Sequence, residues 1–189
     1  MKISKIAIFS LVLSSALFAN EANTTMAFKK EGLNSIKMLG MALKSELKKH
    51  LQADKSGVDA VKFCVDKAAK ITAEVNSKLP ENIRVRRTAL KLRNEANKAD
   101  ATDLKVMQEY VAKIKEGKFS PKDIKVVEVN NSVRVYKPLV TGNVCLKCHG
   151  TNIDPKVSEV IKKYYPHDKA VGFKKGDLRG VIVAEITKK

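Results

Sequence analysis

The chain of 189 residues contains no tryptophan, and only 5% of its residues are aromatic. Proteins that bind single-stranded nucleic acid stack bases on aromatic side chains, so stacking surfaces are scarce here. The scarcity matters because a formal net charge of +17 would otherwise suggest a nucleic-acid partner. The lysines and arginines are spread along the whole chain rather than gathered in one block. We therefore expect no nucleic-acid partner, and a solvated basic surface that can attract an acidic protein.

The sequence also lacks an apolar run of the roughly 20 residues that a membrane-spanning helix requires. Its longest apolar run, from Ile6 to Phe18, follows two lysines and precedes small residues around Ala19. This order is typical of a secretory signal peptide. We therefore expect cleavage of residues 1–19, export to the periplasm and a mature protein that does not span the membrane. An uncleaved anchor is the alternative.

Cysteine is scarce as well, and three cysteines are an odd number that a framework of disulfides would not use up. Two of them, Cys145 and Cys148, stand in the segment VCLKCHG, and His149 follows directly. C-x-x-C-H is the pattern of covalent c-type haem attachment. It suits that chemistry because two thiols must reach two vinyl groups on one porphyrin edge, while an imidazole reaches the iron. The motif predicts one covalently attached haem c with His149 as an axial ligand.

Three other interpretations of the motif are weaker. A zinc site needs about four ligands, and Cys64 and His167 could complete one only through long-range contacts. A thioredoxin-type Cys-x-x-Cys normally begins a helix after a strand, whereas we expect this motif in a loop after a hairpin. A disulfide between Cys145 and Cys148 would close a very small loop and stabilise the chain little. Predicted export favours haem, because bacteria attach haem c outside the cytoplasm.

The second axial position of a bound iron has several candidates. A helix expected from Ser56 onward carries apolar residues in a 3-4-3-4 rhythm that includes Cys64, so this thiol should point inward. A lone inward cysteine is usually a small hydrophobe, and a methionine on an apolar helix face is usually core. Spacing alone therefore leaves the choice open. The other candidates are His50, His167, Met38, Met41 and Met107, and the position can also stay empty.

Hydrophobic periodicity predicts an α+β chain in which helices come first and a small, mostly antiparallel sheet follows. A first helix is expected from a threonine cap at residues 24–25, and a second from a capping box of Ser56 and Asp59. Two β-branched runs flank Asn130-Asn131, as in a hairpin. The apolar stripe of the first helix is Phe28, Ile36, Leu39, Leu43, Leu47 and Leu51. Further elements are expected as helices near 102–116 and 155–164 and as extended segments near 83–94 and 180–186.

The order of these landmarks is similar to that of a family of periplasmic PAS-like domains with c-type haem, formerly described as a domain of unknown function. The matching segments are AVKFC, RRTALKLRNEAN, VCLKCHG and YYPHDKAVGFKKGDLRGVIVAEI, which together span about residues 58–189. The chain departs from the family at Glu95, where the family favours proline after Arg-Asn. Members occur alone or as sensor modules ahead of signalling proteins.

The resemblance implies a PAS-like antiparallel sheet flanked by helices, with the haem on the sheet. On this basis residues 20–56 form an N-terminal helical extension and residues 57–189 the haem domain. The resemblance also implies that Cys64 supplies a thiolate opposite His149. Arg87 and Arg93 lie in or beside a matching segment and can pair with the haem propionates, or they can be exposed strand positions.

Two functions fit these expectations. A haem-based sensor would report redox state or a small ligand by exchanging the weaker axial bond, and it would act through a protein partner. A small electron carrier would instead dock an acidic redox partner on its basic surface. We expect no enzyme, because the sequence offers no carboxylate pair, no Ser-His-Asp order and no second metal site.

Overall fold

The computed structural model describes the backbone of residues 10–189 and the side chains of residues 24–189. Residues 1–9 lie outside the described residues, so the predicted signal peptide at 1–19 stays a prediction. No helix in the described chain has the length and apolar character needed to cross a membrane. The elements are α1 (Ser10–Ala53), α2 (Val58–Asp66), α3 (Ala68–Ser77), β1 (Ile83–Thr88), η1 (Glu95–Asn97), α4 (Ala101–Lys115), β2 (Lys125–Val129), β3 (Ser132–Val140), η2 (Asn143–Cys145), α5 (Leu146–His149), α6 (Pro155–Tyr164) and β4 (Leu178–Thr187).

The strands of the described chain form one antiparallel sheet in the order β1-β4-β3-β2. β2 and β3 form the predicted hairpin, in which Asn130 takes the positive φ of 51° that a tight turn requires. β1 is shorter than the extended segment predicted near 83–94. Its chain leaves the sheet after Thr88, because Asn94 caps the short helix η1 through a hydrogen bond from the Ala96 amide.

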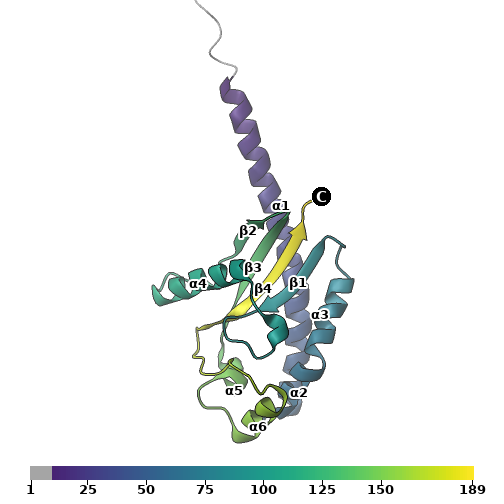
Figure 1. Ribbon diagram of the computed structural model, residues 1–189, viewed down its shortest axis with the longest axis vertical. Helices are drawn as coiled ribbons and strands as arrows, with labels where there is room; N and C mark the ends of the chain where they lie inside the picture. The colour runs from purple at the N-terminus through teal and green to yellow at the C-terminus, as the bar shows by residue number, and fades with distance from the viewer. Residues whose placement is uncertain (1–9) are drawn as a thin grey trace, which may run out of the picture.

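Helices cover both faces of the sheet, with α1 and α3 on one face and α4 on the other (Figure 1). On the α1 face, apolar residues of α1, α3 and the sheet form one cluster that includes Leu39, Val135 and Ala184. On the α4 face, Met107 and Tyr110 pack against Val183 and its neighbours. The predicted α+β class is therefore confirmed, as is an antiparallel sheet flanked by helices with a long helix at the N-terminus.

The predicted apolar stripe of the first helix is confirmed, but the helix extends further toward the N-terminus than predicted. Ile36, Leu39 and Leu43 are buried against the sheet, and Phe28, Leu47 and Leu51 are half-buried. The helix spans Ser10–Ala53 and therefore continues through residues 24–25, since the preceding leucines, alanines and serines contain no helix breaker. The division of the chain at residue 56 stays a prediction. The part of α1 before that point contributes to the same core as the strands after it.

The second predicted helix is two helices, and its predicted capping box is wrong. Asp54, rather than Ser56, accepts the amide of Asp59, and it also accepts the amide and hydroxyl of Ser56. These bonds, led by the one from the Ser56 hydroxyl, lower the pKa of Asp54 to about 2. The Asp59 carboxylate instead pairs with His50 of α1. The chain therefore turns sharply between α1 and α2, and a break at Lys67 separates α2 from α3.

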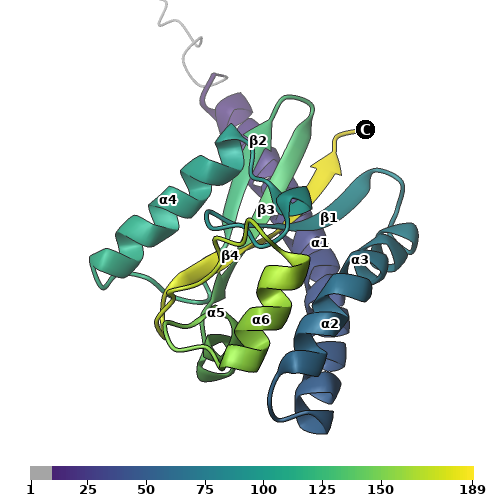
Figure 2. The same ribbon diagram turned by 60° about the horizontal axis from the view of Figure 1, so that its bottom comes forward.

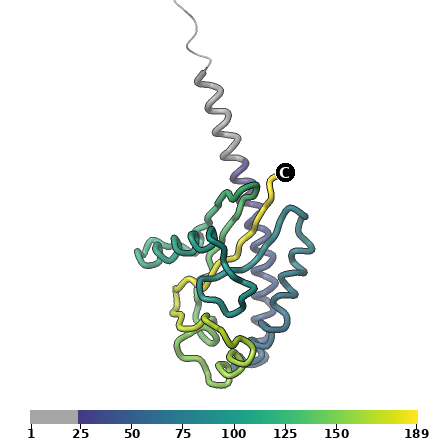
Figure 3. Tube along the Cα trace, viewed as in Figure 1, coloured from purple at the N-terminus to yellow at the C-terminus, as the bar shows by residue number. Residues whose placement is uncertain are grey.

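Three helices, α2, α5 and α6, gather at one end of the sheet, which Figure 2 brings forward and Figure 3 shows along the chain trace. Val61 of α2 packs there against Val157 and Ile161 of α6. The packing joins segments that are about a hundred residues apart in the sequence. It brings the helix that carries Cys64 to the helix that follows the C-x-x-C-H motif.

We expect replacement of Gly32 by alanine to destabilise the fold. Helix α1 lies so close to the sheet here that an added Cβ would sit 2.5 Å from a methyl carbon of the fully buried Val135. Overpacking of this kind costs about 1–3 kcal/mol, which exceeds the gain of up to about 1 kcal/mol in helix propensity. The free energy of unfolding in denaturant measures the effect.

Gly40→Ala is the matched control in the same helix. Its Cβ would meet a methyl of Ile182 at 3.5 Å, an ordinary contact. This variant should be as stable as the parent or slightly more stable. Equal unfolding midpoints for the two variants would contradict the close approach of α1 to the sheet at Gly32.

Candidate functional site

The C-x-x-C-H motif lies on a helical turn rather than in the predicted loop. η2 ends at Cys145, and α5 continues from Leu146 to His149. The amide of Gly150 closes the turn by donating to the Leu146 carbonyl, and a Cβ at this position would come within 2.5 Å of that oxygen. The turn thus depends on glycine. It sets both cysteines and the histidine at fixed angles on one small element, and all three cysteines of the chain are free thiols.

Cys148 lies between α2 and α6, where it packs beside Val61 and Val157. Burial raises the pKa of its thiol, and the nearby Cys64 thiol raises it further. Helix α2, which carries Cys64, packs through Val58 and Val61 beside Cys148. The fold therefore brings the helix of Cys64 to the motif, although 84 positions separate the two cysteines in the sequence.

Cys64 is half-buried on α2, so its predicted inward orientation is confirmed only in part. Burial raises the pKa of its thiol, while the positive charges of Arg87, Arg93 and Arg179 oppose that shift. Guanidinium groups near a thiol favour the thiolate, which is the form that binds metals. The net pKa is still raised, so burial outweighs the three guanidiniums in the metal-free chain. A metal bound to this sulfur would find the three positive charges beside the thiolate.

His149 is held in one orientation by a hydrogen bond from Nδ1 to the carbonyl oxygen of Ala170, at 2.7 Å. Burial, with the charges of Arg179 and Arg93, lowers the pKa of the ring from 6.5 to about 3. The imidazole is therefore neutral, and because a carbonyl can only accept, the proton lies on Nδ1. The lone pair on Nε2 is left for a ligand. The ring of Phe173 meets the imidazole edge-on, with 6.2 Å between centroids.

A cavity of about 150 Å³ lies beside His149, and three arginines line it: Arg87, Arg93 and Arg179. Arg93 pairs with Asp168, whereas neither Arg87 nor Arg179 forms an ion pair with any described residue. Burial and the neighbouring arginines lower the pKa of Arg179 to about 10. Sequence reasoning missed Arg179. Its position in GDLRG, just before the buried strand, was the available signal. The wall of this cavity is positive and suits an anionic group.

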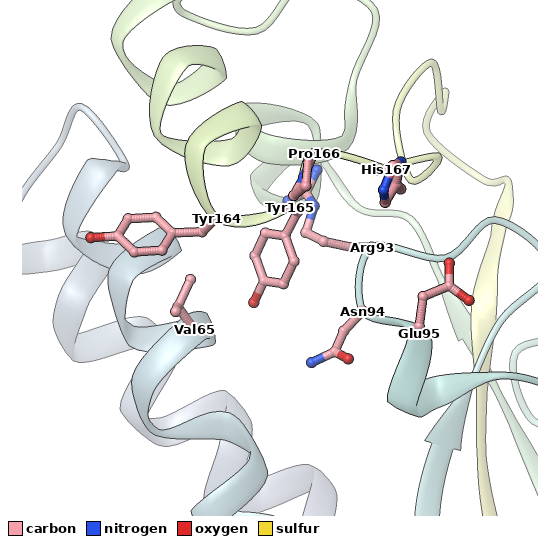
Figure 4. A pocket seen from close by; sticks show the side chains of 8 residues that line it. All are labelled: Val65, Arg93, Asn94, Glu95, Tyr164, Tyr165, Pro166 and His167. Atoms are coloured by element: carbon pink, nitrogen blue, oxygen red, sulfur yellow. The ribbon is translucent and has the colours of Figure 1, made fainter.

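A second cavity of about 360 Å³ adjoins the first at Arg93 (Figure 4). Tyr165 lies in its centre and points its hydroxyl between Val65 and Asn94 (Figure 4). Burial raises the pKa of this tyrosine, and Cys64 raises it further, so the cavity also reaches the surroundings of the α2 thiol. The larger cavity thus lies between α2, the chain after β1 and the end of α6 with the chain that follows it. The smaller cavity lies between β1, the chain after it, α5 and the start of β4.

The other candidates for an axial ligand lie in different surroundings. His50 pairs with Asp59 and stacks on Phe63 at the contact of α1 with α2. Met107 is fully buried on the α4 face of the sheet. The remaining three are exposed, namely Met38, Met41 and His167, and of these His167 lines the larger cavity. Cys64 shares the nearby charges of Arg93 and Arg179 with His149, and its role as a ligand stays a prediction.

The four side chains that the sequence singles out do not converge on one small ion. Among the side chains that the structure describes, no group of three or more His, Cys, Asp or Glu residues could hold a metal ion directly. His149 lines the smaller cavity, and Val65, the residue after Cys64, lines the larger one. The two cysteines of the motif flank His149 on η2 and α5.

Comparison with known proteins gives two matches. The sequence model of the Tll0287-like family matches residues 11–187, nearly the whole chain. A solved structure, described as the crystal structure of the cyanobacterial heme-protein Tll0287, is 22% identical in sequence, with a TM-score of 0.62. The match covers 83% of this chain and 92% of that one. At this identity the likeness shows a shared fold. The search of curated proteins gave no match.

The lowered pKa of the half-buried His149 should make the stability of the cofactor-free chain depend on pH. The unfolded chain takes up the imidazole proton near pH 6.5, but the folded chain does so only near pH 3. The contribution is therefore fully present above pH 6.5 and is lost as the pH falls toward 3. The expected slope of the unfolding free energy approaches about 1.4 kcal/mol per pH unit.

Chemical denaturation between pH 6.5 and 4.5 measures this slope, and His149→Gln separates it from the titration of carboxylates. The variant should show a shallower loss of stability than the parent across this range. Parallel curves for the two proteins would mean that the folded chain protonates this ring as readily as the unfolded chain does.

Proposed function

This chain belongs to the Tll0287-like family, and from that premise we propose that it is an exported haem protein with one covalently attached haem c. The observation that carries the proposal is the neutral His149 on the same helical turn as two free thiols. The heme-protein described for the similar fold supports it. We infer periplasmic export from the signal-like N-terminus, because c-type attachment takes place there.

The side chains of the motif and the cavity beside it fit a haem better than a zinc ion or a disulfide. A haem c needs two thiols, one imidazole nitrogen and neighbours that can neutralise two propionates. Cys145 and Cys148 supply the thiols, and the Nε2 lone pair of His149 supplies the nitrogen. The cavity beside His149 is smaller than the usual 300–1,000 Å³ of a ligand site, so the side chains between it and the adjoining cavity must part to admit a porphyrin.

Each residue has a separate task in this proposal. Cys145 and Cys148 would hold the porphyrin edge through thioether bonds, and His149 would bind the iron through Nε2. Cys64 would supply a thiolate as a further ligand, with the three arginines offsetting its charge. A bound haem supplies an iron that can change its oxidation state or exchange a ligand. A thiolate ligand stabilises Fe(III) and lowers the reduction potential.

Arg87 and Arg179 are the better partners for the propionates. Both line the cavity without an ion-pair partner among the described residues, whereas Arg93 already pairs with Asp168. Carboxylates would neutralise the two unpaired guanidiniums and form charge-assisted hydrogen bonds with them. We therefore keep the predicted propionate contact for Arg87 and add Arg179.

We propose that the protein senses redox state or a small ligand, and that the bond between the Cys64 sulfur and the iron is the one that would be exchanged. A sulfur ligand drawn from a separate helix can release the iron without breaking the covalent attachment on α5. Small electron carriers remain the second candidate class. The net charge of +17 favours that class, because it suits docking to an acidic redox protein. In either role we propose no catalytic activity.

The first prediction of this proposal is covalent haem in the matured protein. Co-expression with a cytochrome c maturation system should give a coloured protein whose denatured mass exceeds that of the mature chain by one haem. Cys145→Ala/Cys148→Ala should abolish the added mass. Cys64→Ala should keep it, because this thiol lies outside the attachment motif. A colourless parent protein of bare polypeptide mass would reject the proposed function.

A second prediction concerns the axial ligand. Cys64→Ala should convert ferric haem from six-coordinate low-spin to a high-spin or water-ligated form and raise the reduction potential, because a donating anion is lost. Absorption and electron paramagnetic resonance spectra measure the change. His50→Gln is the control, since His50 belongs to the α1–α2 contact. An unchanged spectrum in the Cys64→Ala variant would show that Cys64 does not bind the iron.

Gas binding separates the two roles. A sensor should bind CO or NO in the ferrous state with displacement of an axial ligand. A carrier should be reduced rapidly and reversibly with no such displacement.

A further inference from the structure

We propose that Asp168 and Arg93 form a positioning pair that fixes the orientation and tautomer of His149. The inference deepens the proposed function where it concerns the iron ligand. Its core, however, concerns the polypeptide alone. Among the described hydrogen bonds, neither side chain donates to or accepts from the imidazole; both hold Ala170, whose carbonyl accepts the Nδ1 proton of His149, and the charge of Arg93 also lowers the pKa of the ring.

Ala170 is held at both of its backbone polar groups. Its amide donates to Asp168 Oδ1 at 2.8 Å. Its carbonyl accepts from His149 Nδ1 at 2.7 Å and from Arg93 Nη2 at 3.3 Å. The oxygen that receives the histidine proton is therefore also held by the Arg93 guanidinium, and the Asp168 carboxylate holds both that guanidinium and the Ala170 amide.

Arg93 also reaches the motif itself. Its Nη2 donates to the carbonyl oxygen of Cys148 at 2.6 Å and to Asp168 Oδ2 at 2.9 Å, and its Nε donates to the same carboxylate oxygen at 3.2 Å. One guanidinium thus spans the residue before His149 and the residue that accepts the proton of His149. Only arginine offers enough donors in a fixed plane for these contacts.

The pair is buried and has backbone support. The side chains of Arg93 and Asp168 are 10% and 7% exposed. Two further hydrogen bonds, from Phe173 to His149 and from Gly172 to Gly150, hold the segment after Ala170 against α5. The Lys169 amide donates to the Leu92 carbonyl, which ties the same segment to the chain that carries Arg93. Removing one partner would leave the other charge buried and unpaired, so the remaining contacts should rearrange.

This assignment explains why Arg93 is a poor choice for a propionate. Its Nε and Nη2 donors already serve the backbone and Asp168, and a shift of these groups toward a carboxylate on the cofactor would release the Ala170 carbonyl. A hydrogen bond from Nδ1 to a fixed acceptor orients a metal-binding histidine and raises its donor strength. The pair thus acts on the iron through the imidazole.

The first test needs no haem. The full chain without its predicted signal peptide, labelled with ¹⁵N at histidine, should show His149 as a single Nδ1–H tautomer in long-range ¹H–¹⁵N spectra at pH 7. In Asp168→Asn and in the milder Arg93→Lys, we expect the Nε2–H tautomer to become detectable. Glu128→Gln, which removes the exposed ion pair with Lys188, is the control and should leave the spectrum unchanged.

The second test uses the matured haem protein. Asp168→Asn should shift the reduction potential to more positive values and accelerate exchange of the His149 Nδ1 proton by at least about tenfold, because the hydrogen bond is weakened. Arg93→Lys should move both quantities in the same direction by less, since lysine keeps the charge but lacks the planar donors. The Glu128→Gln control should match the parent.

The outcomes separate this inference from the proposed function. A purely structural pair would lower the unfolding midpoint but leave the tautomer, the exchange rate and the potential as in the parent. That result would overturn the inference. Matured protein without haem would reject the proposed function, while the tautomer in the haem-free chain would still decide whether the pair positions His149.

Discussion

The hydrogen bond from His149 Nδ1 to the Ala170 carbonyl is the interaction on which the site depends. Burial alone would leave a neutral imidazole free to carry its proton on either nitrogen. The carbonyl settles the choice, since it can only accept, and it leaves the Nε2 lone pair available. The same bond joins α5 to the segment before β4. The site is therefore positioned by the sheet, because β4 is an inner strand that pairs with β1 on one side and with β3 on the other.

Packing at the end of the sheet completes the site from the other side. Helix α1 approaches the sheet closely at Gly32. After α1 ends, the Asp54 carboxylate accepts the amide of Asp59 and so stabilises the sharp turn into α2. The apolar contact of α2 with α6 carries Cys64 toward Cys148. Each of these contacts is local, yet together they bring the helix that carries Cys64 to Cys148, which is far from it in the sequence. A redox-dependent or ligand-dependent change at Cys64 would act directly on the helix that packs against α1.

The sequence was informative where one local pattern governs the outcome, and less so where long-range contacts do. The stripe of α1, the hairpin at Asn130 and the buried strand β4 follow from periodicity and turn chemistry. The capping box at Ser56 was wrong because Asp54, five residues before Asp59, competes for the same amide. The roles of Asp168 and Arg179 could not be predicted, since both depend on which charges the fold places beside them.

The balance of charge around the two cavities argues for an anionic occupant. Three arginines approach Cys64 and His149, and the described residues supply two carboxylates, that of Asp168, which pairs with Arg93, and that of Glu95, which lines the larger cavity. Removal from water lowers the pKa of both Arg87 and Arg179, although Arg179 also donates to the Lys91 carbonyl and lies over the ring of Phe173. A thiolate at Cys64 and two propionates would supply three negative charges in this region. The arginines thus carry a cost in the cofactor-free chain that the proposed ligand would offset, which is the pattern expected of residues placed for binding rather than for folding.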